Sequence, residues 1–432
     1  MTFDEAVEFL DGHINMEKML AGERATPPTL DRIRELLRLL GDPEQQYPIV
    51  HVTGTNGKSS TSRAIGRLLM AHDLSVGTYT SPHVVSLTER ILVNDEQIAR
   101  DEFALLMAQL ARLEPLLTER PTWFELMTAA AYAHFADIAV NAAVIEVGLG
   151  GTWDATNAAN GAVAVVTSVG LDHLEFLGDT AEDVAGEKSG IIKEGADVVL
   201  GFVDPGPRQV LRDAAQRVGA ASIVEGGEDF GVISDRVAIG GRLVSVRTPR
   251  ARYHELFLPL HGAHQSENLA VALAATEAFF DRPLDADLVT RAIAGLTSPG
   301  RLEVIGRHPL VIIDGTKNEM GATAVRHALE EEWGTVSPRV LVVGMLQGKG
   351  KDPVAILDAL GARSSKLVIA VPAPSPRSMD PDAVAEAARS LGVHAERASS
   401  VEDGLARAKF AAGDDGLVLV AGSLYVAGAA SH

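Results

Sequence analysis

Mostly apolar runs, bounded by polar or glycine-rich segments, mark the predicted strands of this chain. Residues 47–53 (YPIVHVT), 141–147 (NAAVIEV) and 162–169 (AVAVVTSV) form three such runs. Runs of this kind are typical of a parallel sheet covered by helices on both faces, because neither face then alternates with water-exposed positions. The pattern therefore predicts an α/β fold.

Apolar positions three and four residues apart predict helices beside these strands. Residues 29–40 have one apolar face, with Thr29 as the expected cap and a glycine just beyond the last turn. Further helices are predicted over about 59–71 and 266–280. The first strand, a glycine-rich turn and the helix at 59–71 follow one another directly, which is the order of a phosphate-binding unit.

The pattern changes twice further along the chain. Short alternating runs surround the Gly-Gly pair at 240–241 within residues 221–260, which predicts a small antiparallel sheet with a hairpin turn. After the Ser-Pro-Gly segment at 298–300, apolar strands begin again in PLVIID, RVLVVGML, KLVIAVP and GLVLVAGS. We therefore predict two domains, 1–297 with a large parallel sheet and 298–432 as a smaller, Rossmann-like α/β domain.

Composition narrows the possible functions. The 432 residues are 46% hydrophobic and 22% charged, which is typical of a globular protein, and the absence of Cys excludes disulfides, thiolate metal sites and thiol nucleophiles. The net charge of −20 argues against nucleic-acid binding, which needs basic surface. The acidic residues near the start do not resemble a signal peptide, and no apolar run approaches the roughly 18 residues that span a bilayer. We therefore expect a cytoplasmic enzyme without membrane contact.

The strand at 47–53 and the helix at 59–71 are joined by a glycine-rich loop. Its residues are Gly54, Thr55, Asn56, Gly57, Lys58 and Ser59. Glycines let backbone N–H groups face an anion, the helix N-terminus adds its positive dipole end, and the lysine can reach terminal phosphates. The spacing is shorter than the eight-residue P-loop pattern. The loop predicts a nucleotide site, against the alternative of a glycine-rich turn with a surface lysine.

Two more strand ends carry polar side chains. Glu146 ends the run NAAVIEV, and Asp172 and His173 follow the run at 162–169. Ligands of open α/β sheets bind beyond the carboxyl ends of the strands, and nucleotide-bound Mg²⁺ prefers one or two carboxylates with phosphate oxygens. We therefore expect Lys58, Glu146 and His173 to converge on one crevice if their strands are neighbours. Taken singly, Glu146 fits a helix cap or an ion pair equally well.

Other candidates are ambiguous from the residues alone. Arg301, just after the predicted domain boundary, could clamp a transferring phosphoryl group or pair with a local acid. Asp314 ends the run PLVIID at the start of the second domain. Lys188 reads as a solvated helix lysine, and Ser81 lies in a Ser-Pro-His turn.

Together these stretches resemble the folylpolyglutamate synthase/dihydrofolate synthase family of the Mur ligase superfamily. Ten motifs carry the resemblance in family order from near residue 50 to the C-terminus. They are HVTGTNGKSS, TSPHVVSLTERI, FELMTAAAY, EVGLGGTWDATN, TSVGLDHLEFLGDT, GEKSGIIK, HGAHQSENLA, SPGRLEVI, DGTKN and AGSLYVAG. The resemblance implies a large P-loop-type ATPase domain with a pterin pocket and a C-terminal glutamate-ligase domain. It implies an ATP-dependent amide ligase that forms an acyl phosphate, which glutamate then attacks.

The resemblance also implies roles for individual residues. Lys58, His173 and Lys188 would be catalytic, with Lys188 carried as a carbamate. Two Mg²⁺ ions would be held, the first by Ser59, Ser81 and Glu146 and the second by Glu146 and His173. ATP would contact Gly54, Thr55, Asn56, Gly57, Lys58, Ser59, Ser60, Asn268, Arg301 and Asp314. The pterin pocket would be lined by Thr122, Phe124, Asp154 and Ala155. The partners would be a folate-type acid, L-glutamate and ATP, bound by a monomer.

The chain departs from the family pattern at three places. Ser59 replaces the usual Gly after the loop lysine, Thr152 replaces Arg in Gly-Gly-Arg-Leu-Asp, and Lys317 replaces His in Asp-Gly-Ala-His-Asn. Thr152 and Lys317 leave open a Mur-type ligase that acts on a non-folate carboxylate. A third alternative is a nucleotide-sensing protein without activity, whose expected signature would be loss of Lys58, Glu146 or His173.

Overall fold

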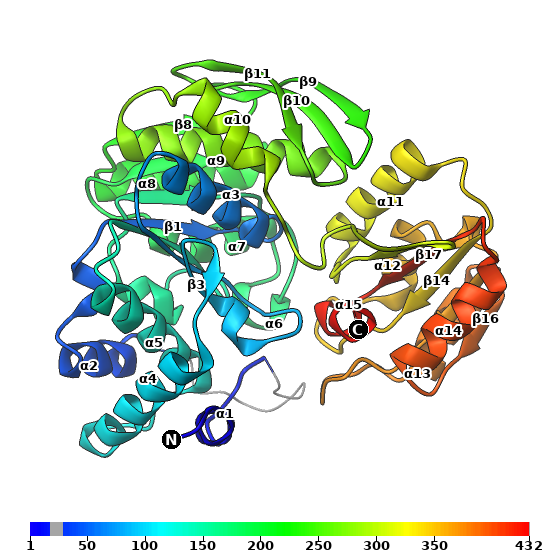
Figure 1. The fold of residues 1–432 in the computed structure, drawn as a ribbon, viewed down its shortest axis with the longest axis horizontal. Helices are drawn as coiled ribbons and strands as arrows, with labels where there is room; N and C mark the ends of the chain where they lie inside the picture. Colours follow the sequence, from blue (N-terminus) through cyan, green and yellow to red (C-terminus); the bar gives the residue numbers. More distant parts are fainter. Residues whose placement is uncertain (18–28, 432) are drawn as a thin grey trace.

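Eight strands form the larger sheet of the computed structural model, which describes residues 1–17 and 29–431 (Figure 1). The strand order is β4-β3-β2-β5-β1-β6-β7-β8, and the five neighbouring pairs from β2 to β8 are parallel. The two remaining pairs, β4-β3 and β3-β2, are antiparallel. The strands are β1 (Ile49–Thr53), β2 (Val76–Tyr79), β3 (Ile91–Val93), β4 (Glu96–Gln97), β5 (Ala142–Glu146), β6 (Val163–Val166), β7 (Asp197–Leu200) and β8 (Ser222–Glu225).

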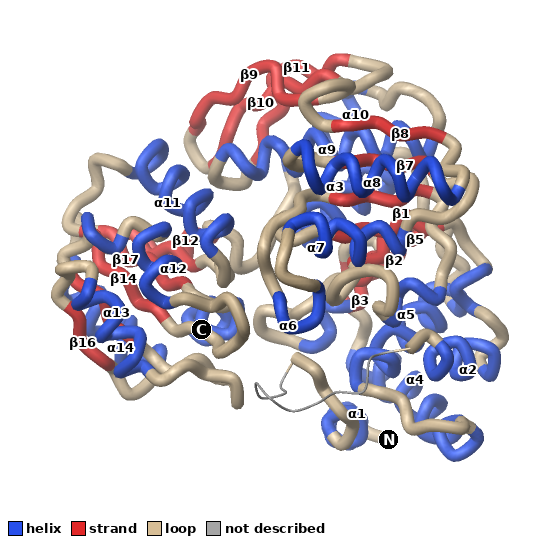
Figure 2. The backbone as a smooth tube through the Cα atoms, turned by 180° about the vertical axis from the view of Figure 1, so that it is seen from behind, coloured by secondary structure: helices blue, strands red, loops and turns tan. Residues whose placement is uncertain are grey.

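Helices cover both faces of this sheet, as the continuous apolar runs predict. Val50 and Val52 of β1 face one layer, whereas Ile49 faces the other. The first layer contains α3 (Lys58–Ala71), α9 (Ala263–Phe280) and α10 (Ala286–Ala294). The opposite layer contains α1 (Phe3–Asp11), α2 (Asp31–Leu39), α4 (Arg100–Leu113), α5 (Trp123–Asp137), α7 (Ala181–Lys188) and α8 (Pro205–Val218). Figure 2 shows the same arrangement from behind.

A three-stranded antiparallel sheet packs on α9 and α10, as the sequence predicts. It contains β9 (Gly231–Ala238), β10 (Gly241–Arg247) and β11 (Arg252–Leu258). Gly240 has a φ of +78° in the tight turn between β9 and β10, a conformation that favours glycine. The predicted start of this sheet at 221 is wrong, because residues 222–225 form β8 at the edge of the large parallel sheet.

A second sheet of six strands forms the rest of the chain, in the order β12-β13-β17-β14-β15-β16. These are β12 (Glu303–Arg307), β13 (Leu310–Ile313), β14 (Arg339–Val343), β15 (Leu367–Ala370), β16 (Ala395–Arg397) and β17 (Leu417–Ala421), all parallel except the β12-β13 pair. Apolar clusters fill both faces beneath the surrounding helices, which are α11 (Glu319–Trp333), α12 (Pro353–Ala359), α13 (Pro381–Ser390), α14 (Val401–Ala412) and α15 (Leu424–Ala430). This smaller α/β unit confirms the predicted fold class.

Figure 1 shows the two sheet units side by side, here called the N-terminal lobe and the C-terminal lobe. Several contacts bridge them. Arg242 of β10 donates to Glu331 and Glu332 of α11, with an Nη1–Oε1 distance of 2.8 Å to Glu332. Lys349 pairs with Asp179 across the same gap at 2.6 Å. The chain therefore has its lobes closed on one another.

The expected cap of the helix at 29–40 is wrong. Helix α2 begins at Asp31 with Leu30 at the N-cap position, and no side chain caps it. Thr29 lies one residue too early to accept a hydrogen bond from the first free N–H groups.

In the described part of the chain, no helix is long and apolar enough to cross a membrane.

Candidate active site

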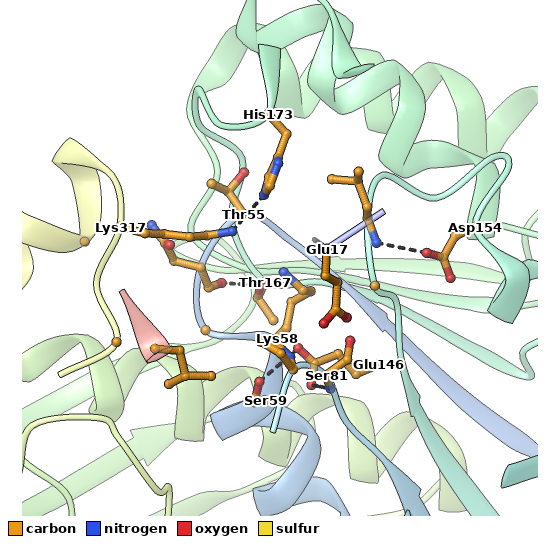
Figure 3. Close-up of a pocket in the computed structure, with 18 of the residues that line it drawn as sticks. Glu17, Thr55, Lys58, Ser59, Ser81, Glu146, Asp154, Thr167, His173 and Lys317 are labelled. Atoms are coloured by element: carbon orange, nitrogen blue, oxygen red, sulfur yellow. Dashed lines mark hydrogen bonds between the residues drawn. The ribbon is translucent and has the colours of Figure 1, made fainter. Parts of the chain in front are cut away.

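A large cavity lies where the two lobes meet, with a volume of about 850 Å³. The N-terminal lobe contributes the loop after β1 and the ends of β5 and β6, and the C-terminal lobe contributes the loop after β13. Figure 3 shows several of these side chains directed into it. The cavity is therefore beyond the carboxyl ends of the parallel strands, where open α/β sheets bind ligands.

The loop after β1 is shaped by two glycines. Gly54 and Gly57 have φ values of +156° and +83°. A Cβ on Gly54 would lie 1.9 Å from Thr167 Oγ1, and one on Gly57 would lie 2.3 Å from Asn268 Oδ1. Only glycine fits these positions, so the loop stays tight as it enters α3. The N-terminal end of α3 then faces the cavity and can bind anions.

Lys58 is the first residue of α3, and its side chain folds back over the loop. Its Nζ donates to the carbonyl oxygen of Gly54 at 2.9 Å. Burial lowers the pKa of Lys58, whereas the nearby carboxylate of Glu146 opposes that shift. The ammonium group of Lys58 thus lies near both the loop and the carboxylate of Glu146 at the end of β5.

Glu146 is the last residue of β5 and is buried, with 1% of its surface exposed. The Ser59 hydroxyl donates to its Oε1 at 2.9 Å, and the Ser81 N–H donates to its Oε2 at 3.2 Å. Burial raises the pKa of Glu146, and the charge of Lys58 acts in the opposite direction. A carboxylate with two adjacent serines offers the oxygen ligands that Mg²⁺ prefers when it arrives with phosphate.

His173 lines both the large cavity and a smaller adjoining one, Asp172 lines the smaller one, and both residues lie against lysines of the C-terminal lobe. Lys317 Nζ is 2.8 Å from His173 Nε2 and 3.2 Å from Asp172 Oδ2. Lys351 donates to Asp172 Oδ1. Burial and then the charge of Lys317 hold the pKa of His173 well below its usual range. His173 is therefore a neutral acceptor for the Lys317 ammonium group.

Lys188 lines a smaller adjoining cavity of about 30 Å³. The side chain is 3% exposed, and burial, followed by the charge of Lys58, lowers its pKa to about 7. The interpretation of Lys188 as a solvated helix lysine is therefore wrong. A buried amine with a pKa of about 7 has a substantial neutral fraction near pH 7 that can react with CO₂, whereas an ordinary lysine is almost wholly protonated there.

The C-terminal lobe brings Arg301 and Asp314 to the large cavity. Asp314 accepts from the N–H groups of Leu302 at 2.9 Å and Thr316 at 2.7 Å. Burial raises the pKa of Asp314, and the Arg301 charge lowers it. Asn268 of α9 contacts Gly57 from the other side. These residues surround the end of the loop.

Thr122, Phe124 and Asp154 line another part of the large cavity. Thr122 caps α5 by accepting from the Glu125 N–H at 3.2 Å, which directs Phe124 into the cavity beside Gly148. Asp154 is buried and accepts from the Leu149 N–H at 2.9 Å. An aromatic ring beside a buried carboxylate can hold a flat, hydrogen-bonding heterocycle.

Most of the predicted site residues line the large cavity. They are Thr55, Asn56, Gly57, Lys58, Ser59, Ser60, Ser81, Thr122, Phe124, Glu146, Asp154, Ala155, His173, Asn268, Arg301 and Asp314. Gly54 and Lys188 line the smaller cavity beside it. The strands that precede Glu146 and His173 are not direct neighbours, because β1 lies between β5 and β6. Their carboxyl ends nevertheless reach the same edge.

Sequence reasoning missed several polar residues at the site. Lys351 holds Asp172, and Asn318 donates to Asp172 Oδ2 at 3.3 Å and Asn56 Oδ1 at 3.2 Å. Arg377 also lines the cavity. The one available signal was the basic loop LQGKGK directly after β14, since it follows a strand end as Glu146 does.

No group of three or more His, Asp or Glu side chains in residues 1–17 and 29–431 is arranged to hold a metal ion.

Comparisons with known proteins agree with this arrangement. Residues 52–276 match the Mur ligase middle domain, and residues 300–424 match the Mur ligase glutamate ligase domain. The dihydrofolate synthase/folylpolyglutamate synthase of Mycobacterium tuberculosis is 37% identical over 85% of this chain and 78% of its own. The M. tuberculosis folylpolyglutamate synthase complexed with ADP has a TM-score of 0.92 at 34% identity, covering 99% of this chain and 97% of that chain. An FPGS–AMPPCP–folate complex has a TM-score of 0.85 at 31% identity, covering 100% and 98%.

Proposed function

This chain belongs to the folylpolyglutamate synthase/dihydrofolate synthase family of Mur ligases, and we propose that its large cavity joins L-glutamate to a folate-type carboxylate with ATP. The chain is thus an ATP-dependent acid–amino-acid ligase. One observation carries the assignment: the glycine-rich loop, Glu146 and an aromatic pocket at Phe124 share a single cavity between the lobes. The family also includes a structure holding both AMPPCP and folate.

The reaction is an acyl transfer in two steps. A carboxylate oxygen of the folate-type acid takes the γ-phosphoryl group of ATP, so the β–γ phosphoanhydride bond breaks and ADP leaves. The amino group of glutamate then attacks the acyl carbon. The bond between this carbon and the phosphate oxygen breaks, phosphate leaves, and the amine loses a proton. Both steps depend on positioning and charge neutralisation rather than on a protein nucleophile.

Residues of this chain would provide both the positioning and the charge neutralisation. The loop after β1 and the N-terminal end of α3 bind the phosphates of ATP through their N–H groups. The residues of this segment are Gly54, Thr55, Asn56, Gly57, Lys58, Ser59 and Ser60. Lys58 neutralises charge on the transferring group. Asn268, Arg301 and Asp314 close over the nucleotide from α9 and the C-terminal lobe. Thr122, Phe124, Asp154 and Ala155 hold the pterin ring.

Mg²⁺ fits the first predicted ion site. Ser59, Ser81 and Glu146 would hold it, and the ion would supply charge neutralisation at the phosphates of ATP. The buried carboxylate of Glu146, which accepts hydrogen bonds from Ser59 and Ser81, supports this assignment. The second predicted site, at Glu146 and His173, fits less well because His173 already contacts Lys317.

A carbamate fits Lys188. Its buried amine has a pKa of about 7, and Lys58 and Lys317 line the same small cavity. A carbamate would turn a buried cation into an anion beside two lysines, which lowers the electrostatic free energy of the site.

The proposal also covers the domain division, the location, the oligomeric state and the partners of the enzyme. The division at 297/298 into a central ATP-binding domain and a C-terminal glutamate-ligase domain is supported by the separate sheets and by the two family matches. We also propose that the enzyme is cytoplasmic and acts as a monomer, since both lobes of this chain contribute residues to the large cavity. The net charge of −20 supports small-molecule partners rather than nucleic acid.

The test is phosphate release from Mg-ATP and glutamate with dihydropteroate, with tetrahydrofolate and without acceptor. Stimulation by dihydropteroate indicates a dihydrofolate synthase, stimulation by tetrahydrofolate a polyglutamate synthase, and stimulation by both a bifunctional enzyme. If neither compound stimulates release while ATP still binds, the folate assignment is wrong, and Thr152 and Lys317 mark a different acceptor.

A further inference from the structure

We propose that the ammonium group of Lys317 is a built-in cation that takes the place of a second divalent ion at His173. The closed chain then holds one divalent ion per nucleotide, at Glu146, and the C-terminal lobe supplies the other positive charge. This inference rests on the proposed ligase function.

The first support is the occupied lone pair of His173. Lys317 Nζ lies 2.8 Å from Nε2, which is the distance of a direct hydrogen bond. A lysine ammonium group can only donate, so Nε2 accepts and its lone pair is engaged. Metal ions bind histidine through such a lone pair. Figure 3 shows the two side chains directed at one another, whereas Glu146 lies in a separate group with Ser59, Ser81 and Lys58.

The second support is the charge around the small cavity beside His173. Three lysines line its volume of about 30 Å³: Lys58, Lys188 and Lys317. Among the described residues that line it, Asp172 is the single carboxylate. Asp172 already pairs with Lys317 and Lys351. A divalent cation would meet the charges of Lys58 and Lys317 without a free carboxylate to balance them, and a carbamate on Lys188 would offset only one of these two charges.

The third support is the position of Glu146, the other expected ligand. Both of its carboxylate oxygens accept hydrogen bonds, from the Ser59 hydroxyl and the Ser81 N–H. His173 lines both cavities, whereas Glu146 lines the large one alone. The described residues also contain no group of three acids or histidines that could hold an ion. Glu146 and His173 thus serve two places, one for an ion and one for Lys317.

The loop that carries Lys317 explains how the charge arrives. Lys317 directly precedes Asn318, which caps α11 and contacts Asn56 and Asp172 of the N-terminal lobe. The ammonium group therefore reaches His173 only while the lobes are closed. A metal ion binds from solution in either state, whereas Lys317 couples the second positive charge to closure of the cavity.

The test counts bound ions rather than activity. Mn²⁺ is titrated into the full chain with AMPPCP, with the chain in excess of the nucleotide, and free Mn²⁺ is followed by its electron paramagnetic resonance signal. A titration without AMPPCP corrects for other binding. We expect one Mn²⁺ per bound nucleotide for the natural chain and two for Lys317→Met, which removes the charge and frees the His173 lone pair.

Lys349→Met is the matched control, since Lys349 also bridges the lobes but pairs with Asp179 away from His173. It should retain one ion. Two ions in the natural chain, or one ion in Lys317→Met, would overturn the inference. Folate-stimulated phosphate release by the natural chain is measured in parallel. Two ions with stimulated release reject this inference alone, whereas absent release under every acceptor rejects the ligase function.

Discussion

The Ser59 hydroxyl donates a hydrogen bond to Glu146 at 2.9 Å, and this contact joins the loop after β1 to the end of the neighbouring strand β5. Replacing Glu146 with Gln keeps the size of the side chain but removes the charge that would hold Mg²⁺. We expect Glu146→Gln to lose phosphate release by about 100-fold or more, because stabilisation of transition-state charge is lost. Acceptor-stimulated phosphate release measures this effect.

Two measurements separate a metal defect from misfolding in Glu146→Gln. The midpoint of urea unfolding should stay close to that of the natural chain, since burial already raises the pKa of Glu146 and the neutral amide carries no desolvation cost. Glu96→Gln, on the exposed strand β4, is the matched control and should keep full activity. Natural turnover in Glu146→Gln would show that the metal assignment is wrong.

Local patterns predicted the local parts of the site well. The loop from Gly54 to Ser59 follows from a strand, two glycines and a helix that are adjacent in the sequence, and it joins β1 to α3 as expected. The contact of Lys317 with His173 joins residues 144 positions apart and exists only across closed lobes. No periodicity records such a pairing, so the contact of Lys317 with His173 and that of Lys351 with Asp172 are visible only in the structure.

The errors in the fold have a similar origin. The short alternating runs around Gly240 predict one antiparallel sheet over 221–260, and this interpretation took in strand β8. An edge strand has a neighbour on one side only, so its side chains are less covered than those of central strands and its apolar run is less continuous. The interpretation of Lys188 as a solvated lysine is wrong because the sequence of a short helix does not show that the rest of the chain buries this charged residue.

The amine of Lys188 should react with CO₂ in a pH-dependent manner. Its pKa of about 7 means that the protonated form dominates below that pH and the neutral form above it. Only the neutral amine attacks CO₂, so carbamate occupancy should rise as the pH increases through about 7 at fixed dissolved CO₂. Carbon-13 NMR of the chain equilibrated with labelled CO₂ follows the carbamate carbon.

Matched variants assign that signal. Lys188→Ala should lose it, whereas Lys193→Ala, a partly exposed lysine on the same segment, should retain it. Loss of Lys188 should also abolish phosphate release, with partial recovery on adding acetate, which can replace the anionic group. A signal that persists in Lys188→Ala, or full activity of that variant, would contradict the carbamate.

Phe124 should set the affinity for the acceptor without affecting ATP. The ring lies against Gly148, where a Cβ would meet Phe124 Cζ at 2.5 Å, and 6.1 Å from the ring centroid of Tyr79. Removing an aromatic stacking partner costs about 1.4 kcal/mol, which corresponds to about a tenfold change in affinity. Phe124→Ala should therefore raise the KM for the folate acceptor about tenfold and leave the Kd of AMPPCP unchanged.

Steady-state kinetics with varied acceptor and isothermal titration with AMPPCP provide the two readouts for Phe124→Ala. Leu105→Ala, on the exposed side of α4, is the control and should change neither constant. An unchanged acceptor KM in Phe124→Ala would place the pterin ring elsewhere in the cavity.

Arg242 should stabilise the closed arrangement of the lobes. Its side chain is 1% exposed and donates to Asp235 on the neighbouring strand and to Glu331 and Glu332 at the far end of α11. Helix α11 begins at the cavity beside Lys317, so Arg242 anchors the helix that presents this lysine. Arg242→Met removes this partner from Glu332, which is 2% exposed and keeps its contacts with His261 and the Gly262 N–H. We expect a loss of about 3 kcal/mol in the free energy of unfolding.

Urea unfolding measures the stability of Arg242→Met, and phosphate release at varied ATP measures its effect on closure. Because α11 would be less firmly held, the KM for ATP should rise together with the loss of stability. Arg236→Met removes an exposed pair with Glu255 on the same small sheet and should change the free energy of unfolding by about 0.5 kcal/mol or less. If the two variants are equally stable, Arg242 does not hold the lobes together, and closure depends on the contacts at Asp172.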